Sequence, residues 1–183
     1  MSGEPRKTPC AIVVMGVAGS GKTTIGEALA AQLGWRYEDG DRFHPKSNVE
    51  KMSAGHSLTD ADRWPWLQAI ADEIDRVCKL GGKVVVACSA LKRAYRDVLV
   101  RGRDDVRIVY LDGTYDLIAG RLAARKGHFM PPTLLESQFK TLQPPGPDEN
   151  PVTVSIDGPV EAIVDSIVRK LAIDPDARRG RYS

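Results

Sequence analysis

The sequence has little that would direct the protein to a membrane, to nucleic acid or to a disulfide-stabilised fold. No apolar run approaches the roughly 18–20 residues that a membrane-spanning helix needs. The 26 basic and 24 acidic side chains leave a net charge of only +2, so there is no electrostatic reason to expect nucleic acid or an anionic membrane as a partner. Only three cysteines occur (Cys10, Cys78 and Cys88), without CxxC spacing, so we expect no disulfide framework and a reducing, cytoplasmic setting.

The remaining composition suits a folded protein of ordinary size. The chain has 183 residues, of which 42% are hydrophobic and 27% are charged. This balance supports a packed core and argues against disorder. We therefore expect a single domain over residues 1–183, with loose polar tails at 1–8 and 174–183.

Strand-like and helix-like segments alternate along the chain. Short apolar or alternating runs predict strands at residues 10–15, 36–38, 83–88, 107–111 and 152–156. Apolar residues at helical spacing predict helices at 22–33, 60–80, 114–125 and from 159 onward. This alternation predicts a three-layer α/β/α fold around a five-stranded parallel sheet, with ligands at the carboxyl ends of the strands.

The loop after the first strand carries the strongest motif in the chain. Residues 16–23 (GVAGSGKT) match G-x-x-x-x-G-K-[ST], with a predicted strand before the motif and a predicted helix after it. Backbone N–H groups of such a loop surround a phosphate, the lysine reaches the β- and γ-phosphates, and the threonine hydroxyl can bind Mg²⁺. The predicted nucleotide contacts are Gly16, Val17, Ala18, Gly19, Ser20, Gly21, Lys22, Thr23 and Thr24.

The small number of asparagines argues against a GTPase. A GTPase would need an Asn-Lys-x-Asp motif, but the chain has only Asn48 and Asn150, and neither is followed by lysine. A chain of this length without a second motor domain also disfavours a translocating ATPase. Among these classes of phosphate-loop protein, a small kinase is the one that remains.

Two carboxylates follow the second predicted strand, in Asp39-Gly40-Asp41. On an extended segment, residues two apart point the same way. One carboxylate could hold Mg²⁺, and the other could accept the proton of an acceptor hydroxyl. The residues leave open which of the two lies nearer the metal.

Polar and basic residues near the same sheet edge suggest an anionic, hydroxyl-bearing acceptor. Positive donors could bind the anion, and a serine with nearby backbone groups could bind hydroxyls. The predicted substrate-binding residues are Asp41, His44, Arg63, Ser89, Lys92, Arg93 and His128.

Residues 121–145 are expected to form a small helical lid. Arg121 and Arg125 are four residues apart on a predicted helix, and a glycine and two prolines follow within residues 126–132. In small kinases such arginines cover the adenine and hold the phosphates, and lid closure excludes water. Together with Lys22 and Asp41, Arg125 completes the predicted catalytic set.

Four segments carry a resemblance to a known family: MGVAGSGKTTIG, GDRFHPKSNVEKMSAGHSLTDADRWPWL, ACSALKRAYRDVL and RKGHFMPPTLLESQF. On these segments, which span about residues 11–145, the chain resembles the small gluconate kinases (gluconokinases), related in fold to shikimate and adenylate kinases. The resemblance implies ATP- and Mg²⁺-dependent phosphorylation of D-gluconate at its 6-hydroxyl, giving 6-phosphogluconate and ADP, often by a homodimer.

The resemblance also implies roles for individual residues. Asp39 would be the carboxylate near a Mg²⁺-bound water, and Asp41 would orient the acceptor. Arg121 would lie over adenine and Arg125 at the phosphates, while Arg63 and the segment 89–93 would face the sugar acid.

One feature departs from many phosphate-loop proteins. The third predicted strand ends in Ala87-Cys88-Ser89, without a metal-binding aspartate, and Asp112 follows a different strand. The metal would then depend on Thr23, water and Asp39. Two alternatives to a gluconate kinase remain at this stage: a kinase for shikimate or a nucleoside monophosphate, and a nucleotide-binding module without catalysis.

Overall fold

The computed structural model describes residues 8–125 and 132–173. Its strands are β1 (Ala11–Met15), β2 (Arg36–Asp39), β3 (Val84–Ala87), β4 (Val106–Asp112) and β5 (Val152–Ser155). Its α-helices are α1 (Lys22–Leu33), α2 (Lys46–Ser53), α3 (Asp60–Lys79), α4 (Arg93–Val100), α5 (Tyr115–Ala124), α6 (Pro132–Thr141) and α7 (Val160–Leu171). Two short 3-10 helices are η1 (Gly40–Phe43) and η2 (Pro147–Glu149).

The five strands form one parallel sheet in the order β2-β3-β1-β4-β5. β1 is central, with Val13 paired to Val86 of β3 on one side and to Ile108 of β4 on the other. The predicted α/β fold and five-stranded parallel sheet are therefore confirmed.

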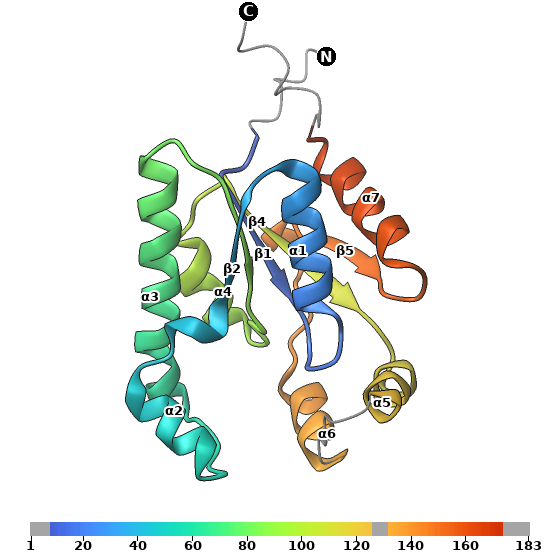
Figure 1. Cartoon of the computed structure of the whole chain (residues 1–183). Helices are drawn as coiled ribbons and strands as arrows, with labels where there is room; N and C mark the ends of the chain where they lie inside the picture. Colours follow the sequence, from blue (N-terminus) through green and yellow to red (C-terminus); the bar gives the residue numbers. More distant parts are fainter. Residues whose placement is uncertain (1–7, 126–131, 174–183) are drawn as a thin grey trace, which may run out of the picture.

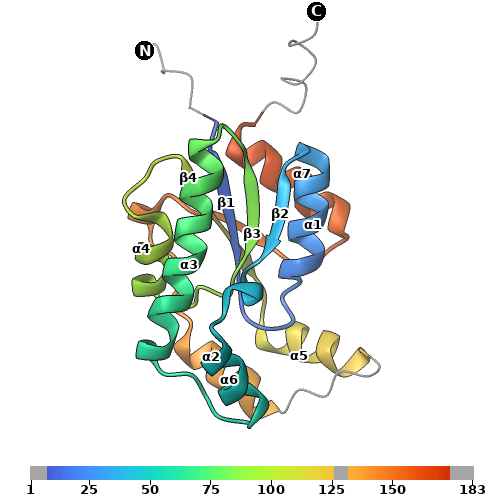
Figure 2. The ribbon, with the colours of Figure 1, turned by 60° about the vertical axis from the view of Figure 1, so that its left-hand side comes forward.

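Helices cover both faces of the sheet (Figures 1 and 2). Ile12 and Val14 of β1 pack in the cluster with α1 and α7, whereas Val13 and Met15 pack in the cluster with α3 and α4. This alternation follows from the two-residue period of a strand, and it explains why β1 is apolar throughout. The helices α2, α5 and α6 lie beyond the carboxyl ends of the strands in both views.

Helix boundaries follow local signals where those signals are strong. The Thr59 hydroxyl accepts the N–H of Asp62, and the Asp62 side chain accepts the N–H of Thr59, which makes a capping box at the start of α3, at the predicted helix start. Gly81 and Gly82 follow the end of α3, next to the predicted helix end at residue 80. Helices α2, α4 and α6 were not predicted.

The expectation that the cysteines form no disulfide is wrong for one pair. Cys10 and Cys78 form a disulfide, with their Cα atoms 5.6 Å apart, whereas Cys88 is a buried free thiol. Cys10 precedes β1 and Cys78 lies in the last turn of α3, so packing of α3 on the sheet brings together two residues 68 positions apart. Within the described part of the chain, no helix has the length and apolarity to cross a bilayer.

Candidate active site

The phosphate loop (residues 16–23) follows β1 at the carboxyl edge of the sheet and leads into α1 (Figure 1). Gly19 and Gly21 have φ values of 79° and 96°, a region that disfavours side chains. A Cβ on Gly16 would lie 2.5 Å from Ser20 Oγ, and one on Gly19 would lie 2.7 Å from Leu122 of α5. The glycines of the motif are therefore required by the local geometry as well as by phosphate binding.

The amino terminus of α1 is built to receive an anion. Gly21 is its N-cap without a side-chain cap, and no acidic residue lies in its first turn. The first N–H groups and the positive end of the helix dipole thus face the loop without a competing negative side chain. Ser20 Oγ is buried without a hydrogen-bond partner among the described residues. Thr23 and Thr24 are exposed in the same turn. These residues fit a bound nucleotide triphosphate.

Lys22 lies in the phosphate loop, at the sheet edge that also carries the two acids after β2. Its Nζ donates to the carbonyl oxygens of Gly16 and Val17, each at 3.0 Å. Burial lowers the pKa of Lys22, while the side chains of Cys88, Asp41 and Asp39 oppose this shift. Asp39 of β2 and Val14 of β1 both pair with Ala87 of β3, so the two acids and the phosphate loop that carries Lys22 lie at the same edge of the sheet.

Asp39 and Asp41 do not project from one extended segment as expected. The strand ends at Asp39, whose Oδ1 accepts the N–H of Asp41 at 3.0 Å and caps η1. A Cβ on Gly40 would lie 2.5 Å from the carbonyl oxygen of Ala87, so the turn between the two acids needs glycine. The reason for the difference is that an aspartate side chain competes for backbone N–H groups and starts a turn. The Asp41 side chain is 83% exposed, free to meet an acceptor.

A magnesium ion fits this site only as a partner of the nucleotide. Among the described residues no group of three or more His, Cys, Asp or Glu side chains is arranged to hold a metal. Mg²⁺ commonly keeps several waters and binds through one or two carboxylates together with substrate phosphates. Thr23 and Asp39 are the residues that would contribute. Burial raises the pKa of Cys88 to about 12, so its thiol stays protonated and is a poor metal ligand near neutrality.

Two predicted acceptor cations gather around Asp60. Lys92 Nζ lies 3.2 Å from Asp60 Oδ1, and the Tyr95 hydroxyl donates to the same oxygen at 2.5 Å. Arg63 lies over the Tyr95 ring, 3.9 Å from Asp60, and donates to the carbonyl oxygen of Leu58 at 2.7 Å. The cluster presents a net positive edge whose side chains are already oriented.

His44 and Arg93 are placed differently from expectation. Burial lowers the pKa of His44, so its ring is uncharged at neutral pH rather than a positive donor. Arg93 pairs with Asp148 at 2.5 Å and lies 3.9 Å from Asp97, so its guanidinium is directed towards η2. There it lines a cavity of about 450 Å³ between α4 and η2.

The acceptor loop (residues 89–93) is joined to the phosphate loop through its backbone. The carbonyl oxygen of Ser89 accepts the N–H of Gly16 at 3.4 Å. Any acceptor bound along this loop would therefore lie beside the phosphate loop. This contact involves the backbone of Ser89, and the predicted role of its hydroxyl stays a prediction.

Arg121 and Arg125, the arginines predicted for the lid, lie at the end of α5. Arg121 Nη2 donates to the carbonyl oxygen of Ile156, after β5, at 2.6 Å. Arg125 is exposed and is the C-cap, so the helix ends one residue earlier than predicted and Arg125 is no longer helical. His128 lies outside the described residues.

Sequence reasoning missed residues that support the two loops. Gln138 of α6 accepts the N–H of Ala18 at 2.6 Å, so α6 contacts the phosphate loop. Arg96 of α4 donates to the carbonyl oxygens of Ala90 and Leu91 at 2.9 and 3.2 Å. Ala90 has a φ of 45°, which is costly for a residue with a Cβ, and the Arg96 bonds hold it there. Gln138 lies in the segment RKGHFMPPTLLESQF, but no sequence pattern there indicates a contact of its side chain with the phosphate loop.

Arg96 is held by a buried ion pair whose loss should destabilise the fold. Its guanidinium donates to Glu149 at 2.7 and 3.2 Å, and the two side chains are 1% and 8% exposed. We expect Glu149→Ala to lower the free energy of unfolding by about 3–5 kcal/mol, because the guanidinium is left buried without its carboxylate. Urea denaturation measures this change. The control is Glu73→Ala, which breaks a partly exposed pair with Arg76 and should cost about 1 kcal/mol or less.

The Arg96–Glu149 pair also predicts how the stability of the fold changes with pH. Desolvation pushes the pKa of Glu149 upward, but hydrogen bonds from Arg96 and the Gly146 N–H outweigh it, so the pKa lies below its usual value. A lowered folded pKa gives stability that is fully present above the unfolded value of about 4.3 and is lost as pH falls through the folded value. Equal losses from Glu149→Ala and Glu73→Ala would contradict this account.

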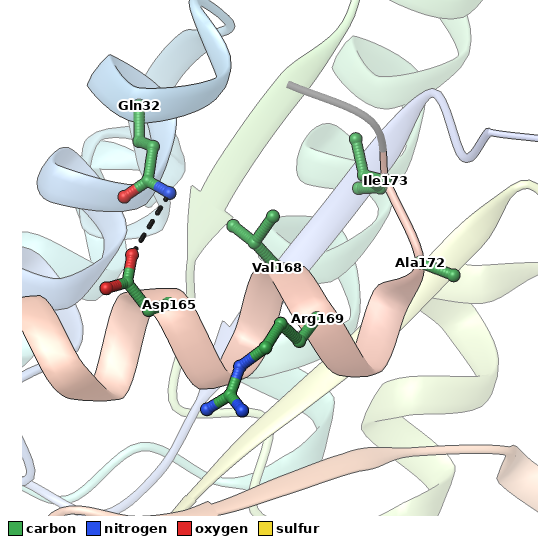
Figure 3. A pocket seen from close by; sticks show the side chains of 6 residues that line it. All are labelled: Gln32, Asp165, Val168, Arg169, Ala172 and Ile173. Carbon is green, nitrogen blue, oxygen red and sulfur yellow. Dashed lines mark hydrogen bonds between the residues drawn. The ribbon is translucent and has the colours of Figure 1, made fainter. Parts of the chain in front are cut away.

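A second cavity lies away from the predicted site. It has a volume of about 440 Å³ and lies between Gln32 of α1 and the end of α7 (Figure 3). Gln32 donates to Asp165 across it at 3.3 Å. Because Gln32 is near the carboxyl end of α1, this cavity is at the opposite end of that helix from the phosphate loop, and it contains none of the predicted site residues.

The sheet, the phosphate loop and the acids beside Lys22 define a small phosphate-loop kinase of the α/β class. Comparisons with known proteins support this class. The family model described as shikimate kinase matches residues 18–170. The gluconokinase of Gluconobacter oxydans is 47% identical over 162 residues, covering 88% of this chain and 90% of that protein. The thermoresistant gluconokinase of Escherichia coli K12 is 46% identical over 157 residues, covering 85% of this chain and 90% of that protein.

A solved structure agrees with the sequence relatives. The crystal structure of a gluconokinase from Sinorhizobium meliloti 1021 has a TM-score of 0.83 and 44% identity, covering 91% of this chain and 94% of that one. The chain belongs to the gluconokinase family, within the wider shikimate kinase group of phosphate-loop kinases. The predicted resemblance and enzyme class are confirmed, and family membership implies ATP as the phosphoryl donor.

Proposed function

We propose that the enzyme transfers the γ-phosphoryl group of ATP to the 6-hydroxyl of D-gluconate, giving 6-phosphogluconate and ADP. One observation supports the proposal beyond family membership: Asp39 of β2 and Val14 of β1 pair with the same residue of β3, Ala87, so the carboxylates after β2 and the phosphate loop after β1 lie at one edge of the sheet. A phosphate donor and an acceptor hydroxyl can meet only where such groups share one site.

The proposed mechanism assigns work to three side chains. Lys22 binds the β- and γ-phosphates and balances their charge. Asp41 holds the terminal hydroxyl of gluconate in line with the γ-phosphorus and accepts its proton as the new O–P bond forms and the bond to the leaving oxygen of ADP breaks. Arg125 stabilises the charge that spreads over the transferred phosphoryl oxygens. Because this transition state is loose, positioning and charge outweigh proton removal.

Around these groups we propose the remaining contacts. Mg²⁺ would be bound by Thr23 and, through water, by Asp39, and when bound it neutralises phosphate charge. Arg121 would cover adenine, and Arg63 with Lys92 and the acceptor loop would bind the carboxylate and hydroxyls of gluconate. His128 completes the set proposed for the acceptor, whereas the Arg93 guanidinium, paired with Asp148, is left out of it.

An acceptor panel tests the proposal. ADP formation is measured with Mg²⁺ and ATP against gluconate, other sugar acids, shikimate and nucleoside monophosphates, and ³¹P NMR identifies the product. We expect gluconate to have the highest kcat/KM and the phosphate to be on the 6-oxygen. A preference for shikimate or a nucleotide would mean that this compound, and not gluconate, is the acceptor. No turnover with any acceptor would indicate a non-catalytic module.

Arg63→Ala should raise the KM for gluconate by about tenfold or more, because a charged donor to an anionic acceptor is lost. The KM for ATP should change less than about twofold. Initial-rate kinetics with each substrate varied separates the two constants. Arg169→Ala on α7 is the matched control, since it removes an arginine beside the remote cavity of Figure 3. Weaker ATP binding with unchanged gluconate binding would disprove the acceptor assignment.

We propose a homodimer in the cytoplasm, supported by the family resemblance rather than by a contact surface. Light scattering measures the mass of the assembly. In a reducing cytoplasm the Cys10–Cys78 pair would be reduced. Mass spectrometry of protein alkylated at cell lysis should then find all three cysteines alkylated.

A further inference from the structure

Behind Asp41 lies a buried polar pair whose chemistry the proposed function does not use. Asn48, in the first turn of α2, is 2% exposed, and the His44 side chain is 6% exposed. A buried amide and a buried imidazole both need hydrogen-bond partners, and each partner restricts where the hydrogens lie.

The contacts of Asn48 determine the tautomer of His44. Asn48 Nδ2 donates to the carbonyl oxygen of Asp62 at 2.9 Å, and because that oxygen can only accept, the amide cannot be turned the other way. The same Nδ2 lies 3.3 Å from His44 Nδ1. An amide nitrogen has no acceptor to offer, so Nδ1 must be the acceptor. The neutral ring therefore carries its proton on Nε2.

The ring is also held in place. It stacks on Trp66 with centroids 4.1 Å apart and an interplanar angle of 16°, and Trp66 Nε1 donates to the carbonyl oxygen of Gly40 at 2.8 Å. In this position His44 Nε2 lies 4.0 Å from Asp41 Oδ1. Within residues 8–125 and 132–173, it is the one Lys, Arg or His side-chain nitrogen within 4.0 Å of the Asp41 carboxylate.

We infer that Asn48 and His44 are positioning residues for Asp41: Asn48 holds His44 with its proton on Nε2, and that N–H orients the Asp41 carboxylate for the acceptor hydroxyl. The inference rests on the proposed role of Asp41. The inference requires the exposed Asp41 carboxylate to rotate so that the 4.0 Å separation shortens to hydrogen-bond length. One carboxylate oxygen then accepts from His44, and the other is left for the substrate hydroxyl.

Burial supports the neutral ring that this arrangement requires. Desolvation lowers the pKa of His44, the negative charge of Asp41 opposes the shift, and the positive charge of Arg63 adds to it. At neutral pH the ring is therefore a donor through one nitrogen only.

Kinetics of two substitutions test the positioning role. His44→Phe keeps a ring to stack on Trp66 but has no N–H, so kcat should fall about 10-fold to 100-fold, while the KM for ATP changes less than about twofold. His44→Gln restores a side-chain N–H donor and should recover a large part of kcat. His56→Phe, in the exposed loop before α3, is the control and should leave kcat unchanged. A His44→Phe enzyme with kcat within about twofold of the parent would overturn the inference.

A double-mutant cycle shows whether His44 acts through Asp41. In an Asp41→Asn background, adding His44→Phe should change kcat less than about twofold, because the group it positions has already been altered. Full additivity of the two losses would mean that His44 acts on its own, and would overturn the inference.

Nitrogen-15 NMR of histidine-labelled full-length protein measures the tautomer without any activity. The His44 signal, assigned by its absence in His44→Phe, should show a protonated Nε2 and a bare Nδ1 at pH 7. Asn48→Asp replaces the amide donor by an acceptor and should shift the proton towards Nδ1. A parent ring protonated on Nδ1 overturns the inference, whereas a wrong acceptor in the panel overturns only the proposed substrate. The kinetic arms are then measured with the acceptor that the panel identifies.

Discussion

Lys22→Ala is expected to lower turnover by about 10³-fold with every acceptor tested. The amine lies within 3.0 Å of two carbonyl oxygens of its own loop, so it is held where the outer phosphates of a nucleotide would bind. Burial disfavours its charge in the free protein, and the carboxylates of Asp39 and Asp41 favour it. A bound triphosphate adds further negative charge, and the lysine is then a fully charged partner for the phosphoryl oxygens.

The measurement is steady-state ADP formation with saturating ATP and gluconate. Lys79→Ala, an exposed lysine at the end of α3, is the control and should retain parental activity. Circular dichroism and thermal unfolding show whether the Lys22→Ala protein is folded. A folded variant that keeps more than about a tenth of the parental turnover would remove Lys22 from the transfer step.

Asp41→Asn is expected to lower kcat by about 10²–10⁴-fold, with a smaller change in the KM for ATP. Asparagine keeps the size of the side chain but cannot accept the hydroxyl proton. Asp41 is 83% exposed and its backbone N–H is held by Asp39, so this substitution changes chemistry with little effect on packing. Stability of the variant should therefore be close to that of the parent.

Asp39→Asn provides the comparison that separates the two acids. If Asp39 binds the metal through water, raising the Mg²⁺ concentration should recover part of its lost activity, whereas Asp41→Asn should not respond. An Asp41→Asn enzyme that responds to Mg²⁺, beside an Asp39→Asn enzyme that does not, would exchange their roles. Unchanged turnover in Asp41→Asn would exclude that residue from the mechanism.

The inner strands β1 and β3 could be predicted because they are covered on both faces. β1 and β3 are unbroken apolar runs, and each lies within one or two residues of its predicted range. The start of α3 was predictable because Thr59 and Asp62 form a purely local motif. Where the physical cause lies within a few residues, sequence reasoning succeeds.

Two of the missed helices, α2 and α4, bury a polar side chain. The one buried residue of α2 is Asn48, so this helix has no apolar stripe, and α4 is only eight residues long and buries Arg96 together with Tyr95 and Leu99. The partners of these two polar side chains, the carbonyl oxygen of Asp62 and the Glu149 carboxylate, are 14 and 53 residues away. Such residues become recognisable only after the chain has folded.

The candidate site also contains features that could be predicted from nearby residues and features that depend on distant segments. The phosphate loop could be located in the sequence because its glycines and lysine form one continuous motif. The direction of Arg93 towards Asp148, the contact of Gln138 with Ala18 and the pairing of Cys10 with Cys78 could not, since each depends on distant segments. The turn at Asp39 is an exception, because its cause is local: the Asp39 side chain accepts the N–H of Asp41 and caps η1, although an extended segment was predicted there.

A crystal structure with gluconate and a non-hydrolysable ATP analogue most directly tests the arrangement of donor and acceptor. The account predicts the triphosphate inside residues 16–23, with Lys22 on its outer phosphates, and the 6-hydroxyl of gluconate within hydrogen-bond distance of Asp41 and facing the γ-phosphorus. A gluconate bound away from Asp41, or a triphosphate bound outside the phosphate loop, would contradict it.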